Sequence, residues 1–160
     1  MVRQPNSNDC FVCGRHNPYG LHLTFYDNGR DEVAAEYTVP AHYQGYPGLV
    51  HGGIAAAILD EVLGRVAMIG NPNRFMMSVK LEVKYRQPIP IETPLKISGR
   101  LVKLRGRLAQ AEGFIYLPDE TVAAEAFITL ADVPAGVLPA ADLSALGWRV
   151  DSAGIGGLGD

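Results

Sequence analysis

The sequence predicts an α+β fold in which an antiparallel β-sheet curls around one long helix, with the elements in the order β-β-α-β-β-β-β. Two observations support this prediction. Residues 54–69 are apolar almost throughout, which indicates a single buried helix. Segments on both sides of it alternate apolar and polar residues between turn signals, which is typical of strands. Since such a helix must be covered on most of its sides, a sheet wrapped around it is the economical arrangement.

The length of the chain favours one domain. It has 160 residues, of which 48% are hydrophobic, enough for one substantial core and too few for two. We expect the domain to cover residues 1–132, with residues 1–18 as an N-terminal segment that holds a cysteine pair. Residues 133–160 are rich in proline and glycine and are predicted to form a tail.

Two strands are expected before the helix. Apolar and polar residues alternate over 21–26, and the Asp-Asn-Gly run at 27–29 supplies a hairpin turn. The return strand covers residues 33–39 and ends at Pro40. A loop over residues 41–50 then leads into the helix.

Four strands are expected after the helix. In the clearest of them, apolar residues from Val79 to Tyr85 alternate with charged ones, which gives one apolar and one charged face, and Pro88 stops the strand. The other three are Leu95 to Lys103, Leu108 to Leu117 and Val122 to Leu130.

Composition argues against several classes of function. The net charge is −3 and the basic residues are scattered, so no nucleic-acid-binding surface is indicated. The long apolar stretch is interrupted by Asp60, Glu61 and Arg65, and the N-terminus has no hydrophobic signal region. We therefore expect a cytoplasmic protein that binds neither nucleic acid nor membrane.

Cys10 and Cys13 form a C-x-x-C pair. With only these two cysteines in the chain, no disulfide framework is expected. The pair could be half of a zinc site completed by His16 or His22, or a redox pair, but a closed zinc site usually needs four ligands. We favour a tight turn here and assign no residue to a metal.

The start of the helix has features of an anion-binding site. Gly52 and Gly53 follow His51, and the helix is predicted to begin near this histidine. The first N–H groups of a helix lack intrahelical partners and carry partial positive charge, so the Gly52 N–H can bind a developing anion. His51 is expected to shape the loop, and both His51 and Gly53 are placed beside the bound substrate.

Two carboxylates lie within the apolar helix, and their surroundings differ. Asp60 shares a helix face with small and apolar residues, so it is predicted to be desolvated and suited to act as a base or nucleophile. Glu61 precedes Arg65 by four residues, the order that favours an ion pair, which we expect on the solvent side. Glu61 is therefore the weaker candidate for catalysis of the two, and a surface ion pair is the favoured interpretation; we place Glu61 among the substrate-binding residues.

These motifs resemble the hotdog-fold acyl-CoA thioesterases of the PaaI-like group. The resemblance covers roughly residues 10–131 and depends most on the His-Gly-Gly triplet at 51–53, with Asp60 nine residues after the histidine. The Cys-Phe-Val-Cys-Gly run at 10–14 is also similar to many members. The resemblance implies hydrolysis of an acyl-CoA thioester without a cofactor, in which the Gly52 N–H binds the thioester carbonyl and Asp60 is the base or nucleophile.

The resemblance implies two further catalytic residues. Relatives often place Asn or Gln six residues before the histidine; this chain has Gly45 there and Gln44 one position earlier. Others place Ser or Thr at the start of the strand after the helix, which Ser78 matches. Ser78 is two residues before Lys80, so it would lie on the same polar face of the strand unless the strand is bulged there.

Family members bury a sheet edge in homodimers, so the resemblance also implies a homodimer or homotetramer with shared active sites. Two alternatives stay open. One is a hotdog protein that binds acyl-CoA without catalysis, in which Asp60 only lines a pocket. The other is a hotdog enoyl-CoA hydratase or dehydratase, for which His42 and Asp60 would be the reacting pair.

Overall fold

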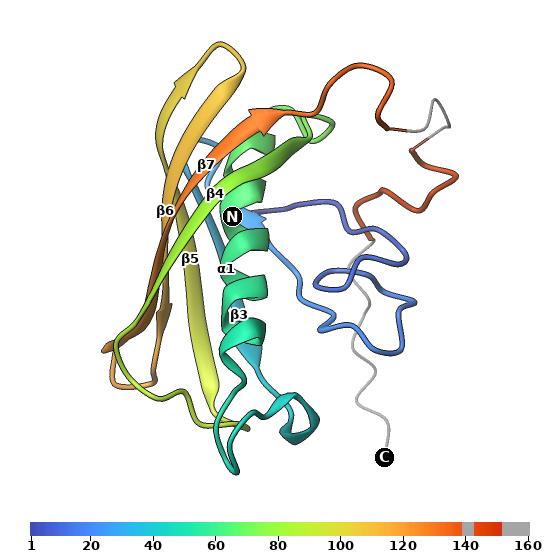
Figure 1. The fold of residues 1–160 in the computed structure, drawn as a ribbon. Helices are drawn as coiled ribbons and strands as arrows, with labels where there is room; N and C mark the ends of the chain where they lie inside the picture. Colours follow the sequence, from blue (N-terminus) through green and yellow to red (C-terminus); the bar gives the residue numbers. More distant parts are fainter. Residues whose placement is uncertain (139–142, 152–160) are drawn as a thin grey trace.

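The computed structural model describes residues 1–138 and 143–151. A seven-stranded antiparallel sheet curls around the helix α1 (Gly52–Arg65), as Figure 1 shows, and its strand order is β1-β2-β3-β5-β6-β7-β4. The predicted α+β class, with a sheet wrapped around one long helix, is confirmed. No helix among the described residues is long and apolar enough to span a membrane.

The strands after α1 agree with the prediction, and those before it differ. The bounds are β1 (Val2–Arg3), β2 (Tyr26–Asp27), β3 (Glu32–Thr38), β4 (Met76–Tyr85), β5 (Pro94–Arg105), β6 (Leu108–Tyr116) and β7 (Val122–Asp132). Short 3-10 helices, η1 (Ala41–Tyr43) and η2 (Val66–Met68), lie before and after α1. Three strands precede the helix where two were expected, because β1 carried no alternation long enough to reveal it.

The segment from Leu21 to Phe25 shows why β2 is shorter than predicted. Its side chains alternate between buried and exposed, as the sequence indicates. However, the Leu21 N–H donates to the Phe11 carbonyl at 2.8 Å, and the Leu23 N–H donates to the Val12 carbonyl at 2.9 Å. The segment is therefore extended but is held mainly by the N-terminal segment.

Two glycines on neighbouring strands let α1 approach the sheet closely. Gly99 of β5 and Gly113 of β6 are opposite each other in the ladder and face the helix. A Cβ on Gly99 would lie 3.0 Å from the Val62 carbonyl oxygen, and one on Gly113 would lie 2.9 Å from Cδ2 of Leu63. The helix backbone can take this position only because both residues lack a side chain.

Part of the predicted tail packs on its own domain. Trp148 lies against Phe75 with ring centroids 5.3 Å apart, and its Nε1–H donates to the Pro72 carbonyl at 3.1 Å. Arg149 forms an isolated antiparallel bridge with Asn6 of the N-terminal segment. The glycine-rich run at 152–160 and residues 139–142 lie outside the described part of the chain.

We expect Gly113→Ala to lower the free energy of unfolding by about 1–3 kcal/mol, because the new methyl group would press on Leu63 and push the helix away from the sheet. Chemical denaturation measures the change. Gly64→Ala is the matched control, since a Cβ there meets nothing within 4 Å and alanine favours the helix by up to about 1 kcal/mol. Equal stability of Gly113→Ala and the unaltered chain would contradict this account of helix packing.

Candidate active site

The first turn of α1 leaves one backbone donor unused. His51 is the N-cap, and its Nδ1 accepts the Gly53 N–H at 2.9 Å. The N–H groups of Ile54 and Ala55 donate to the His51 carbonyl at 2.9 and 3.2 Å. Among the described residues nothing accepts the Gly52 N–H, so it is free at the positive end of the helix.

A cavity of about 780 Å³ lies at this end of the helix. It is lined by Gly52, by loop residues that include Gly45 and His51, and by residues 85–89 at the end of β4 and beyond it. The Tyr85 hydroxyl donates to the Gly52 carbonyl at 2.8 Å, which ties the end of β4 to the start of α1. The predicted anion donor thus borders a cavity large enough for a small-molecule ligand.

Gln44 lies in the loop before the helix, where its side-chain oxygen accepts the Gly48 N–H at 3.0 Å. Gly48 has a φ of 82°, a conformation that glycine adopts readily. In this chain Gln44 therefore holds the turn that leads to His51.

Asp60 and Ser78 are in direct contact. The Ser78 hydroxyl donates to Oδ1 of Asp60 at 2.5 Å. Ser78 is opposite the buried Leu130, and a register shift between Ser78 and Lys80 leaves Val79 as an extra residue. This bulge turns Ser78 toward the helix, which the strand parity alone would not allow. Both residues belong to the same chain.

The ion pair between Glu61 and Arg65 is confirmed, but its predicted solvent-side position is wrong. Oε1 of Glu61 lies 2.9 Å from Nε of Arg65, whose side chain is only 1% exposed. The Arg65 guanidinium lies over the Phe25 ring, 4.4 Å from its centroid, and donates to the Pro5 carbonyl. Glu61 therefore turns toward the N-terminal segment.

The other oxygen of Glu61 faces the cysteine pair. The two Sγ atoms of Cys10 and Cys13 and a carboxylate oxygen of Glu61 all lie within 4.8 Å of one another. A hydrogen bond from Cys13 lowers the pKa of Cys10 to about 6, and the same interaction raises the pKa of Cys13. His16 and His22 are both exposed and are not part of this group.

The predicted catalytic groups of one chain lie at two different places. Gly52 and Asp60 are eight residues apart on the helix, which corresponds to roughly 12 Å along its axis. Gly52 contacts Tyr85 at the end of β4, whereas Asp60 contacts Ser78 near its start. Asp60 does not line the cavity beside Gly52.

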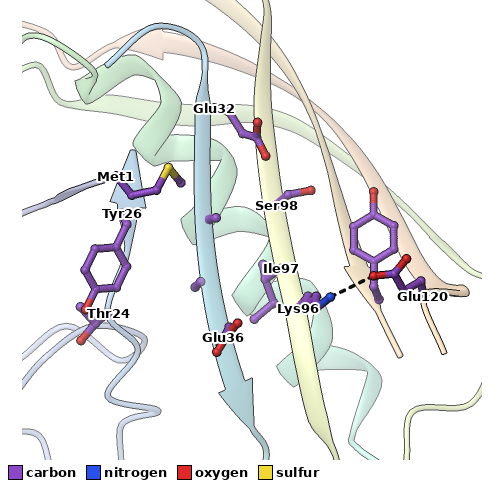
Figure 2. A pocket seen from close by; sticks show the side chains of 12 residues that line it. Met1, Thr24, Tyr26, Glu32, Glu36, Lys96, Ile97, Ser98 and Glu120 are labelled. Carbon is purple, nitrogen blue, oxygen red and sulfur yellow. Dashed lines mark hydrogen bonds and ion pairs between the residues drawn. The ribbon is translucent and has the colours of Figure 1, made fainter. Parts of the chain in front are cut away.

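A second cavity, of about 830 Å³, lies on the outer face of the sheet, away from α1 (Figure 2). Its lining includes Tyr26, Glu36, and the ion pair between Lys96 and Glu120, whose atoms are 3.0 Å apart. None of the residues predicted for the site lines it. His42, proposed for the hydratase alternative, packs on the Tyr43 ring instead of approaching Asp60.

Comparison with known proteins finds similarity to thioesterases. Residues 47–124 match the model of the thioesterase superfamily. Acyl-coenzyme A thioesterase THEM4 of Rattus norvegicus is 31% identical over 83 residues, 52% of this chain and 35% of the relative. The protein of the same name in Bos taurus is 28% identical over 86 residues, 54% of this chain and 34% of the relative. The chain thus spans about a third of the length of these relatives.

Solved structures share the fold. The crystal structure of one thioesterase superfamily protein superposes with a TM-score of 0.70 and 29% identity, covering 78% of this chain and 63% of that one. The smu.793 protein of Streptococcus mutans, solved with acetyl CoA, superposes with a TM-score of 0.64 and 17% identity, covering 69% of this chain and 88% of that one. The sheet wrapped around α1 is therefore the hotdog fold.

Proposed function

Because residues 47–124 match the thioesterase superfamily and the chain has the hotdog fold, we propose that it hydrolyses an acyl-CoA thioester to the free acid and coenzyme A. The observation that carries the proposal is the free Gly52 N–H at the positive end of α1, beside a cavity. Relatives named acyl-coenzyme A thioesterases support the substrate class.

The proposed chemistry uses two groups on α1. As oxygen attacks the thioester carbon, negative charge develops on the carbonyl oxygen, and the Gly52 N–H together with the helix dipole stabilises it. Asp60 either removes a proton from the attacking water or attacks the carbon itself. The carbon–sulfur bond then breaks, and the coenzyme A thiolate leaves and takes up the proton that Asp60 removed from water, or one from solvent where Asp60 itself attacked. In the second case a mixed anhydride of Asp60 and the acyl group forms, and water hydrolyses it to release the acid and restore the carboxylate. Ser78 orients the Asp60 carboxylate through its hydrogen bond.

The separation of these groups favours a site shared by two copies of the chain. β4 is a ten-residue edge strand with exposed apolar side chains, Met77 at 49% and Val79 at 63% exposure. Such an edge is suited to pair with another strand. Antiparallel pairing of β4 with its counterpart would set the start of one strand, with Asp60, against the end of the other, with Gly52. We therefore propose a homodimer, alone or within a tetramer.

The remaining predicted residues are proposed to position these groups. His51 accepts the Gly53 N–H, which leaves the Gly52 N–H as the free donor of the first turn. Gln44 holds the loop that carries His51 through its bond to Gly48. The orientation of Glu61 toward the cysteines favours a role in supporting α1 over direct contact with substrate.

We expect Asp60→Asn to fold normally and to lower the turnover of acyl-CoA by about 100-fold or more, because an amide neither accepts a proton nor attacks the carbon. A thiol-release assay over short, long and aromatic acyl-CoA substrates measures it. Asp31→Asn, in the exposed loop before β3, is the matched control and should leave turnover unchanged.

Three outcomes of that assay would contradict the proposal. Near-normal hydrolysis by Asp60→Asn would remove Asp60 from the mechanism. If the unaltered chain releases thiol from none of the acyl-CoA substrates, an acyl-CoA-binding protein is favoured. Addition of water to an enoyl-CoA without thiol release would favour a hydratase.

The Gly52 donor can be deleted without disturbing the helix. Proline is favoured at the first helical position, and His51 before it is extended, with φ −61° and ψ 133°, as proline requires. We expect Gly52→Pro to lower kcat by about 100- to 1,000-fold. Gly52→Ala keeps the N–H and places its Cβ 3.5 Å from the Tyr85 ring, an ordinary contact, so it should keep most activity. Equal losses in the two variants would argue against the donor role.

A shared site predicts complementation between two inactive variants. If Asp60→Asn and Gly52→Pro subunits are mixed and allowed to exchange, half of the dimers are mixed and each contains one intact site. Activity should then recover to about a quarter of the unaltered level. Mass spectrometry of the intact dimers verifies exchange. Mixed dimers without activity would show that each chain contains its own complete site.

A further inference from the structure

We propose that Cys10, Cys13 and Glu61 bind a zinc ion that fastens the N-terminal segment to helix α1. Three observations carry the inference: the backbone geometry around the two cysteines, the convergence of three anionic ligand atoms, and the anchoring of Glu61. None of them depends on the proposed hydrolysis.

The loop at residues 10–14 presents its sulfur atoms in the way that metal-binding loops do. The N–H groups of Val12 and Cys13 donate to Sγ of Cys10 at 3.3 and 3.4 Å, and these bonds stabilise a thiolate. The Gly14 N–H closes the turn on the Cys10 carbonyl at 2.9 Å. A Cβ on Gly14 would lie 2.3 Å from that carbonyl oxygen, so only glycine fits. The loop is thus built to aim both sulfurs to one side.

The ligand atoms are spaced closely enough for one ion. All three lie within 4.8 Å of one another, and Oε2 of Glu61 is 3.8 Å from Sγ of Cys10. Zinc binds sulfur at about 2.3 Å and carboxylate oxygen at about 2.0–2.2 Å, so tetrahedral ligands are about 3.5–3.8 Å apart. Small rotations of these side chains would therefore bring all three atoms to zinc-binding distance. The hydroxyl of Ser7, 3.9 Å from Sγ of Cys13, or a water molecule can fill the fourth position.

The surroundings favour a cation over a redox pair. Cys13 is 1% exposed, which keeps it from the partner thiol that disulfide exchange requires, and the Glu61 carboxylate beside Sγ of Cys10 adds negative charge that a cation would offset. Oε1 of Glu61 is held by Arg65 at 2.9 Å, which orients the carboxylate as groups around metal ligands do. Two thiolates, one carboxylate, the guanidinium and a divalent cation together have no net charge. The donor set, two sulfurs and one oxygen, suits zinc.

The test uses the full chain, purified under a phosphine reductant without chelator. Elemental analysis should find about one zinc per chain, and replacing it by Co²⁺ should give the thiolate-to-cobalt charge-transfer band. Substitution of both cysteines by serine should abolish binding, and Glu61→Gln should weaken it by at least about 10-fold. Asp9→Asn, an exposed carboxylate on the same segment, is the matched control and should bind normally.

A second measurement uses the unaltered chain, so it tests the proposal even if the cysteine variants fail to fold. In the unaltered chain, Zn²⁺ should protect Cys10 and Cys13 from alkylation, which peptide mass spectrometry detects. Absence of zinc together with absence of the cobalt band and of protection would overturn the proposal. Zinc retained by the double serine variant, or a Cys10–Cys13 disulfide in place of metal under the reductant, would overturn it as well.

Discussion

The close contact between α1 and the sheet is the constraint on which the other features depend. Gly99 and Gly113 lie opposite each other on neighbouring strands; the Val62 backbone lies on Gly99, and the Leu63 side chain lies on Gly113. Larger residues there would force the helix outward, and interiors packed as densely as protein cores do not absorb such a shift. The depth of the helix in turn decides which of its side chains reach β4. The close approach that Gly99 and Gly113 allow is thus one condition for the contact between Asp60 and Ser78, beside the bulge at Val79.

The length of β4 explains why one chain holds Gly52 and Asp60, the groups proposed to act in catalysis, apart. α1 runs alongside this strand, with its first turn tied to Tyr85 and its third turn at Ser78. A helix separates residues eight positions apart by roughly 12 Å, too far for both to contact one carbonyl group. The same edge strand leaves its backbone groups available for pairing. Pairing of this edge with a second copy in antiparallel register, as proposed above, would bring the two halves of the proposed site together.

Elements that are marked by local sequence patterns were predicted correctly. Features that depend on contacts with residues far away in the sequence were not. The strands after α1 were found because alternation and proline or glycine turns mark them. The alternation over 21–26 predicted burial correctly, but the hydrogen bonds of that segment go to the N-terminal segment, which no pattern reveals. Ser78 faces the helix because of a bulge at Val79, which the sequence allowed but did not indicate. Arg65 is buried because Phe25, forty positions away, covers it.

Adjacent carboxylates on one helix point about 100° apart, so Asp60 and Glu61 serve different neighbours. Asp60 points to β4, and Glu61 points to Arg65 and the cysteine pair. Fixing Glu61 on that side fixes the rotation of α1 about its own axis, because a helix turns as a rigid unit. The direction of Asp60 is thereby set from the opposite side of the helix. The N-terminal segment, although distant from the cavity at Gly52, thus helps to orient the carboxylate proposed to act on the thioester.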